Sequence, residues 1–493
     1  MTISKKIIIL FLLFLGLLCR LYKIDSPIAD WHSFRQADTA SVARNFETTG
    51  IDLLHPTYHD LSNIQSGVDN PKGYRMVEFP IYNLISVGSH KFFRLFSSNI
   101  SLETSSRLTS IVFSLLSAFL IFLIANSITH QFLPSLFSMA VFLFLPFNIY
   151  YSRTILPEPT AVFFILLSLY LFRKNIFLSS IFFALSILTK PYTALIFFPV
   201  FVWLIFTHKS YFLQRKSFIF LTIFSFVSLL PLVLWRLWIK QFPAGIPASE
   251  WLLNNSTNPV FPVWYHGYNL TFLNKLVAFR PSWFRWLFYE RLAKLILAAY
   301  GLVPLILGFA YKKNHAVKFC ISLMVGILLY FIIVAQGNIQ HDYYQILIIP
   351  SLSFIIGFGY YYLISFVFDS KVFSIFTALI IFSMSTYFSW DQIKNYYTIN
   401  NPIIITAGLK ANELLPKNAL VIAPYNGDTA FLYQTARSGW PLEVYDLNVI
   451  KNQHPDNPLY LVSVNYDTYT NNMISKYPSI YKSDQYIILD LND

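Results

Sequence analysis

The chain has 493 residues, of which 55% are hydrophobic and 12% are charged, and its mean hydropathy is +0.52. Soluble domains are about 25% charged, so this composition excludes a soluble globular protein and indicates a polytopic membrane protein. The net charge of +12 is typical of cytoplasmic loops rich in Lys and Arg, and no basic cluster interleaved with aromatic residues indicates nucleic-acid binding.

The first apolar segment, Ile7 to Leu21, follows Lys5 and Lys6 and no other charge. The positive-inside rule therefore predicts a cytoplasmic N-terminus and places the next polar stretch on the opposite side of the membrane. That stretch, Asp30 to Phe46, reads DWHSFRQADTASVARNF and combines acids, a base and cations. We interpret it as a reactive set of side chains just outside the bilayer, where a substrate with a lipid tail is processed.

A polar loop over residues 25–78 follows the first apolar segment. It is too long for a simple connector, so it is either functional or contains short helices of its own. Small and apolar residues recur at helical spacing from Asp38 to Phe46, which predicts an amphipathic helix that lies on the membrane surface.

Apolar stretches dominate the next three hundred or so residues, as expected for membrane-spanning helices. They lie at Phe79–Phe96, Leu108–Ile128, Phe132–Tyr151, Thr160–Leu171, Ile176–Leu188, Thr193–Phe206, Phe218–Trp238, Leu292–Tyr311, Val317–Ala335, Tyr344–Phe368 and Val372–Phe388. The stretch Phe79–Phe96 contains His90, Lys91 and Arg94 and is interpreted as interfacial rather than membrane-spanning. We therefore predict about 11 transmembrane helices.

The basic residues between these stretches predict their orientation. The groups at residues 173–174, 209–216 and 312–318 fall in alternate connections, and the positive-inside rule places them in the cytoplasm. The opposite connections, and with them the C-terminal tail, then face outward. They are the connections that carry Arg153–Glu158, Lys190, Gln241–Arg291 and Gln336–Gln345.

The composition changes near residue 391, where Asn, Asp, Pro and Gly become more frequent. We expect a membrane domain over residues 1–390 and a small extracytoplasmic α/β domain over residues 391–493. The expected elements of the second domain are three strands and a helix, at Ala419–Pro424, Leu459–Val464, Tyr486–Leu491 and Ile404–Leu415.

The outward-facing connections place polar side chains at one depth beside the membrane, so we expect them to converge on a single outer cavity. The candidate catalytic acids are Asp30, Asp38 and Glu158. The candidate substrate-binding residues are His32, Arg35, Arg75, Glu78, Arg153, Lys190, His341, Tyr343 and Tyr344.

Each candidate also has a structural interpretation. Asp30 would serve equally well as a loop or capping residue, and Asp38 as the N-cap of the helix that follows it. Glu158 suits a helix start, Arg153 suits the membrane interface, and the two histidines suit hydrogen-bonded loop positions. Their coincidence on one face favours a shared function.

The chemistry of these side chains predicts a glycosyltransferase. An acid suits a general base that takes a proton from an attacking hydroxyl or amine, and cations and phenols suit a phosphate that is held and then leaves. Both are needed when a sugar moves from a polyprenyl-phosphate donor to a lipid, glycan or protein acceptor. We place this reaction at the outer face of the plasma membrane.

Two alternatives stay open. A polymerase or ligase that uses diphosphate-linked carriers would suit the arginines Arg280, Arg285 and Arg291 of a large external loop, and the number of donor phosphates would decide between them. A lipid flippase or transporter would show flux without product, although such proteins often contain internal repeats that are not found in this sequence.

Five segments carry a family resemblance, in the order WHSFRQADTASVARNF, VEFPIYNL, RTILPEPTAVFF, LTKPYTAL and QHDYYQILIIP. They resemble bacterial glycosyltransferases of the GT-C superfamily, in the branch of the lipid A aminoarabinose transferases and the protein O-mannosyltransferases. The resemblance covers roughly Lys5 to Trp390. It implies a GT-C fold and an inverting transferase that uses a dolichyl- or undecaprenyl-phosphate sugar.

In that family an Asp of the first external loop is the base and an acid of the second external loop assists it. Glu158 matches the second acid. The acidic pair expected in the first loop is absent here, and Asp30 and Asp38 lie on either side of the position where it is expected. Of these two residues we favour Asp30 as the base.

The resemblance also implies which residues contact the phosphate of the lipid donor. Glu78 matches the acid of a Glu-Lys-Pro-Pro motif, but Phe79 replaces its Lys, which makes Arg75 a candidate substitute. The residues 341–344 match the family's segment near the lipid phosphate. The branch does not depend on a metal, so we expect neither a metal nor another cofactor.

Overall fold

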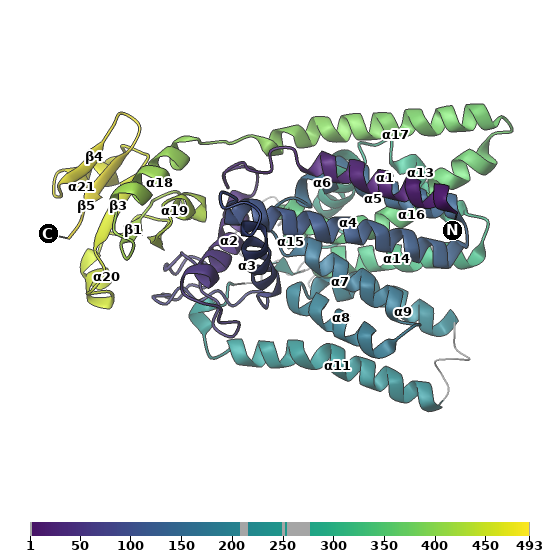
Figure 1. The fold of residues 1–493 in the computed structure, drawn as a ribbon, viewed down its shortest axis with the longest axis horizontal. Helices are drawn as coiled ribbons and strands as arrows, with labels where there is room; N and C mark the ends of the chain where they lie inside the picture. Colours follow the sequence, from purple (N-terminus) through teal and green to yellow (C-terminus); the bar gives the residue numbers. More distant parts are fainter. Residues whose placement is uncertain (1, 208–214, 249–251, 254–276, 493) are drawn as a thin grey trace.

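The computed structural model describes residues 2–207, 215–248, 252–253 and 277–492. A bundle of helices makes up most of the molecule, and a small sheet with its own helices lies at one end of the long axis (Figure 1). The N-terminus lies at the opposite end of the bundle from this sheet. The predicted external loop Gln241–Arg291 lies partly outside the described residues, and the basic residue Lys209 lies wholly outside them.

Five helical segments of the described chain are long and apolar enough to cross a membrane. They are α4 (Leu102–Thr129), the part Leu221–Ile239 of α11 (Arg215–Ile239), α14 (Asn314–Ile333), the segment Asp342–Val367 around α16 (Ile349–Tyr362), and α17 (Lys371–Ile393) with the turn that follows it. Shorter apolar helices are α5 (Phe132–Phe144), α7 (Glu158–Leu171), α8 (Ile176–Thr189) and α9 (Tyr192–Thr207). The chain is thus a helical membrane protein, and the number of about 11 crossings and their orientation stay predictions.

The remaining helices of the bundle are shorter or carry charges. They are α1 (Ile3–Arg20), α6 (Pro146–Tyr151), α12 (Pro281–Phe284), the π-helical η5 (Arg285–Ile296), α13 (Leu302–Leu307) and α15 (Ala335–Gln340). The short 3-10 segments of this part are Pro243–Gly245, Gly308–Ala310 and Asp342–Ile348, and a π-helical turn covers Leu363–Val367.

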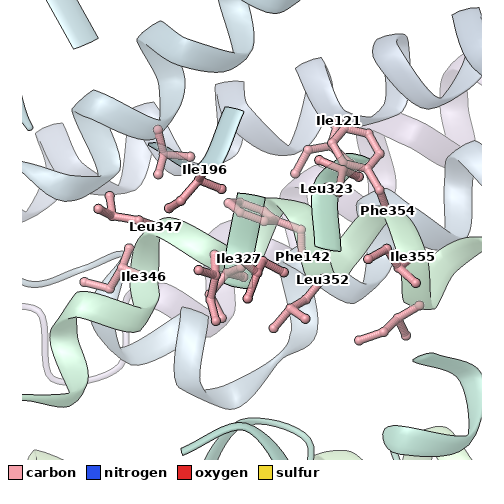
Figure 2. Close-up of a cluster of buried hydrophobic side chains, with 14 of the residues drawn as sticks. Ile121, Phe142, Ile196, Leu323, Ile327, Ile346, Leu347, Leu352, Phe354 and Ile355 are labelled. Carbon is pink, nitrogen blue, oxygen red and sulfur yellow. The ribbon is translucent and has the colours of Figure 1, made fainter. Parts of the chain in front are cut away.

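The core of the bundle is built around α16, which is buried along nearly its whole length. Figure 2 shows Phe354 of this helix among apolar side chains of α4, α5, α9 and α14. Glycines allow the close approach, because a Cβ at Gly357 would lie 2.3 Å from the Ser138 backbone and one at Gly359 would lie 1.7 Å from the Pro304 carbonyl. Small residues at helix contacts are what membrane bundles use to pack tightly.

The predicted surface helix Asp38–Phe46 is buried instead. The observed helix α2 (Ser33–Thr48) packs against α3 (Ile81–Arg94) on one side and α19 (Thr429–Gln434) on another, and residues 35–43 are all buried. Many of its side chains are the small residues Ala and Ser, so neighbouring helices can pack close to it. The helix begins after His32, so Asp38 lies in its second turn and is not its N-cap.

The C-terminal segment forms a five-stranded mixed sheet of order β2-β1-β3-β5-β4. Its strands are β1 (Leu420–Ile422), β2 (Ser438–Trp440), β3 (Leu459–Ser463), β4 (Ser479–Lys482) and β5 (Ile487–Asp490). Its helices are α18 (Ile403–Leu414), α19, α20 (Leu447–Gln453) and α21 (Thr468–Ile474), and a 3-10 turn over Lys394–Tyr397 precedes them. The strands β1, β3 and β5 and the helix α18 lie within about two residues of the predicted runs. The extracytoplasmic location of this segment stays a prediction.

The edge strand β2 does not end the sheet, because the first polar loop pairs with it. The Gly439 amide donates to the His59 carbonyl at 2.9 Å, and the Leu61 amide donates to the Gly439 carbonyl at 2.8 Å. Gly439 has φ +157°, and a Cβ there would lie 1.8 Å from the Val421 carbonyl oxygen. The loop over residues 25–78 is therefore held by the C-terminal segment.

Candidate active site

A cavity of about 640 Å³ lies between α2, the first polar loop and the ends of the bundle helices. Its lining includes four cations and two carboxylates together with apolar side chains such as Leu188, Leu232 and Trp235. The charged residues of the lining are Arg35, Asp38, Arg75, Glu78, Lys190 and Arg236. A wall of this mixed kind suits a ligand with one apolar and one anionic part.

One ion-pair network crosses the cavity wall from α2 to α7. Glu78 accepts hydrogen bonds from the Arg35 guanidinium and, at 3.0 Å, from the Lys190 ammonium, which also pairs with Glu158 at 2.7 Å. Burial alone would raise the pKa of Glu78, but Arg35 and Lys190 more than offset this and hold it well below its usual range. Glu78 is therefore ionised at neutral pH.

Lys190 is held between two carboxylates. Burial alone would lower its pKa, whereas Glu158 and Glu78 raise it, so the ammonium stays charged. Glu158 begins α7, is fully buried and does not line the cavity. Neither of its oxygens has a well-directed hydrogen bond to a described residue, so Lys190 is its one ion-pair partner there.

Asp38 does line the cavity. Its Oδ2 pairs with the Arg75 guanidinium at 2.8 Å, and its Oδ1 accepts a hydrogen bond of 2.7 Å from the Thr429 hydroxyl. Arg75 also lies over the Tyr58 ring, with 5.0 Å between the guanidinium carbon and the ring centroid. The carboxylate therefore has a fixed orientation at the edge of the cavity.

Asp30, the acid favoured from the sequence, lies elsewhere. Its Oδ2 pairs with Arg153 at 3.0 Å and its Oδ1 accepts a hydrogen bond of 2.7 Å from Gln36, and none of these three residues lines the cavity. Both partners of the ion pair are almost completely buried. This geometry is that of a structural ion pair, because a buried charge needs a partner and hydrogen bonds.

The segment 341–344 contributes aromatic rings to the cavity. Tyr343 stacks on Tyr344 with 4.6 Å between the ring centroids, and His341 stacks on Tyr343 at 5.4 Å. Burial and the neighbouring His32 lower the pKa of His341 to about 4, so it is neutral at pH 7. The Lys190 ammonium lies 5.4 Å from the Tyr344 ring centroid.

Asp342 is a buried carboxylate that the sequence analysis did not select. It accepts hydrogen bonds from the Trp31 indole, from His32 at 2.7 Å, and from the hydroxyls of Tyr151 and Tyr396. It therefore connects the start of α2, the end of α6 and the turn after α17. An acid at the start of an apolar span is a signal that could have revealed it.

Arg236 is a second residue that the sequence analysis missed. It belongs to α11, lines the cavity and is exposed, and no ion pair or hydrogen bond involves it among the described residues. It differs from the other three lining cations, which are all paired with carboxylates. The signal was a lone arginine inside the apolar run LVLWRLWI.

The twelve candidates from the sequence thus divide into two sets. The cavity is lined by Arg35, Asp38, Arg75, Glu78, Lys190, His341, Tyr343 and Tyr344, and not by Asp30, His32, Arg153 and Glu158. Within the described ranges no group of three or more His, Cys, Asp or Glu is arranged to hold a metal ion. The expectation of no metal stays a prediction.

The fold is similar to that of known proteins, although no family model and no curated protein matches the chain. The crystal structures of ArnT from Cupriavidus metallidurans, bound to undecaprenyl phosphate and in the apo state, each superpose with a TM-score of 0.64 at 12% identity over 97% of both chains. The archaeal oligosaccharyltransferase AglB from Archaeoglobus fulgidus, in complex with an inhibitory peptide and a dolichol-phosphate, has a TM-score of 0.49 at 11% identity and covers 94% of this chain and 70% of its own. The chain thus has the fold of ArnT along nearly all of its length, in agreement with the family resemblance of the sequence motifs.

Proposed function

From the fold that this chain shares with ArnT along nearly all of its length, we propose that it is a glycosyltransferase. It moves a sugar from a polyprenyl-phosphate carrier to an acceptor, with inversion, at the outer face of the plasma membrane. ArnT was crystallised with undecaprenyl phosphate, and a carrier of that class is the donor we assign here. The single observation that carries the proposal is the cavity beside α2, in which a buried carboxylate and a cation without a carboxylate partner occur together.

Arg236 is the residue that we assign to the donor phosphate. An arginine without a carboxylate partner can form two parallel hydrogen bonds to phosphate oxygens, whereas Arg35, Arg75 and Lys190 already neutralise carboxylates. The isoprenoid chain requires apolar contacts, which Leu232 and Trp235 of the same helix provide beside Arg236. The phosphate and its lipid tail are thus recognised by one helix.

Asp38 is the residue that we assign as the base, in place of Asp30. In the reaction the acceptor oxygen or nitrogen attacks the anomeric carbon, and the bond from that carbon to the phosphate oxygen breaks. The phosphate leaves with the bonding electron pair, and the acceptor proton passes to the Asp38 carboxylate. Asp38 lines the cavity and has a fixed orientation, while Asp30 does not line it.

The network of Glu78, Lys190 and Glu158 has a supporting role. Its two carboxylates keep the Lys190 ammonium charged and in place beside Tyr344, so that this part of the cavity wall has a fixed geometry. Glu158 acts through Lys190 and is a positioning residue in this scheme. We assign no step to a metal ion.

A donor screen tests the proposal. Purified protein in lipid nanodiscs is incubated with polyprenyl-phosphate sugars and an extract of cell-envelope acceptors, and mass spectrometry follows the release of free polyprenyl phosphate together with a glycosylated acceptor. Polyprenyl-diphosphate sugars and protein-free nanodiscs are the controls. Transfer only from diphosphate donors, or lipid flux across proteoliposomes without any transfer, would contradict the proposal.

A further inference from the structure

A residue from the C-terminal segment contacts the proposed base directly. The Thr429 hydroxyl lies 2.7 Å from Asp38 Oδ1 and 3.1 Å from the Phe34 carbonyl oxygen, and both Thr429 and Asp38 are buried. A hydroxyl has one proton to donate, and the shorter, charge-assisted contact is the one to the carboxylate. Thr429 therefore fixes the oxygen of Asp38 that Arg75 does not hold.

Thr429 is held in place by the docking of the helix that it begins. Further along α19, the Tyr433 carbonyl accepts a hydrogen bond of 2.8 Å from Arg44, and the Gln434 amide donates to the Ile28 carbonyl at 2.9 Å. The Arg44 guanidinium carbon lies 3.6 Å from the Tyr433 ring centroid. These contacts tie α19 to α2 and to the segment that precedes it.

The other partner of Asp38 depends on the same segment through the first polar loop. The loop is paired with β2 at Gly439, and within it the Tyr58 amide donates to the Gly73 carbonyl at 2.7 Å. The Arg75 amide in turn donates to the Pro56 carbonyl at 2.7 Å. The sheet edge therefore supports the stretch of loop from which Arg75 reaches Asp38.

We propose that Thr429 is a positioning residue for Asp38, so that the C-terminal α/β segment is a working part of the active site. This inference rests on the proposed function, because it takes Asp38 as the base. The hydroxyl keeps the carboxylate in one rotamer, with the remaining lone pairs free for the acceptor proton. An undocked C-terminal segment leaves Asp38 misoriented.

Thr429 is a neutral partner of Asp38 among several charged and titratable neighbours. The charged and titratable groups near Asp38 are Arg35 on its own helix, Arg75, Asp60 and Tyr58 on the polar loop, and Asp428 before α19. A hydrogen bond to an ionised carboxylate stabilises its charged form. Removing it leaves Oδ1 of Asp38 without this hydrogen bond, so the carboxylate no longer has a fixed orientation.

The test compares Thr429→Val, Thr429→Ser and Tyr433→Phe in the transfer assay. The Val variant lowers kcat by about tenfold and leaves KM for the donor within a factor of two. The Ser variant keeps the hydroxyl and stays close to the wild-type protein in both. Tyr433→Phe removes a different side-chain hydrogen bond of α19, the one that the Tyr433 hydroxyl donates to Glu103 of α4, and its kcat and KM stay unchanged.

Folding is checked by gel filtration and by thermal melting, and Thr429→Ala replaces the Val variant if that variant does not fold. A kcat that stays at the wild-type value in a folded hydroxyl-free variant overturns the inference, as does a Ser variant with tenfold lower kcat. Because every value is a ratio to the wild-type protein, these results differ from failure of the proposed function, in which the wild-type protein itself transfers no sugar.

Discussion

At the residue scale, the polar side chains of this membrane protein differ in how completely they are paired. Asp30 with Arg153 forms a buried ion pair, Asp38 is shared between Arg75 and Thr429, and Arg236 has no described partner. A charge that is fully paired stabilises the fold, whereas one that retains binding capacity beside a cavity is available to a substrate. The two kinds of charge therefore respond differently to substitution.

The first prediction compares the two aspartates by the same substitution. Asp38→Asn lowers kcat by at least about 100-fold, because an amide cannot accept the acceptor's proton and general-base catalysis contributes this much. Asp30→Asn weakens a buried ion pair, so it lowers the melting temperature, and the folded fraction retains turnover within about tenfold of the wild-type value. Turnover per folded molecule is the measurement; full turnover in Asp38→Asn would rule out this base.

The second prediction concerns the cation without a carboxylate partner. Arg236→Gln raises KM for the lipid-linked donor by about tenfold or more, since a charge-assisted hydrogen bond to phosphate is lost. It weakens product inhibition by free polyprenyl phosphate by a similar factor. Lys240→Gln removes an exposed charge one residue after the same helix ends and is the matched control. Equal KM values for the two variants would exclude Arg236 from the phosphate site.

At the element scale, the position of α2 depends on contacts from three directions. The helix begins after His32, whose φ of +54° is in the left-handed region, and His32 Nε2 donates a hydrogen bond of 2.7 Å to the Asp342 carboxylate. The helix then passes between α3 and α19. The orientation of Arg35 and Asp38 toward the cavity follows from this arrangement.

The third prediction tests the carboxylate that anchors the start of α2. The Asp342 carboxylate accepts hydrogen bonds from four side chains, and Asp342→Asn replaces it by an amide whose NH2 group is itself a donor. The substitution therefore lowers the free energy of unfolding by about 3 kcal/mol or more. Thermal melting in detergent measures the loss. Asp369→Asn changes an exposed acid and leaves the melting temperature within error; a stable Asp342→Asn protein would refute the anchoring role.

The sequence was sufficient to predict part of this arrangement. Loop charges in an apolar chain led to eight of the residues that line the cavity but not to Arg236, and short strand-like runs matched β1, β3 and β5 in the C-terminal segment. The burial of α2 could not be predicted, because its partner Thr429 lies 391 residues away from Asp38. For the same reason the sequence could not separate Asp38 from Asp30, since the partner of each comes from a distant segment.

At the scale of the whole molecule, the bundle and the C-terminal sheet form one continuous structure. The sheet extends into the first polar loop through Gly439, and α19 covers α2. Two acids lie at this junction. Burial raises the pKa of Asp60 to about 6 and, with Asp38 nearby, that of Asp428 also to about 6.

The fourth prediction follows from these raised pKa values. The folded protein binds the Asp60 proton more tightly than the unfolded chain does, so its stabilising contribution is complete below pH 4 and is lost as the pH rises to about 6. Asp60→Asn removes the cost of the buried charge, so the variant melts at a higher temperature than the wild-type protein at pH 7.5. The difference, at most about 3 kcal/mol, disappears near pH 4.

The control for this titration is Asp484→Asn, which changes an exposed acid of the C-terminal segment. It shifts the melting temperature equally at both pH values or not at all. A melting temperature of Asp60→Asn that follows the wild-type curve at pH 7.5 would contradict the assignment of a buried, costly charge to this junction.

The pairing of Gly439 with the first polar loop also has a consequence for biosynthesis. The ribosome synthesises the first polar loop early and Gly439 hundreds of codons later. During most of its translation the nascent chain therefore lacks both the strand that pairs with this loop and the hydroxyl that contacts Asp38. A chain that ends before Gly439 lacks the backbone pairing that supports this loop, so under the proposed function we expect such a truncated protein to have no transferase activity.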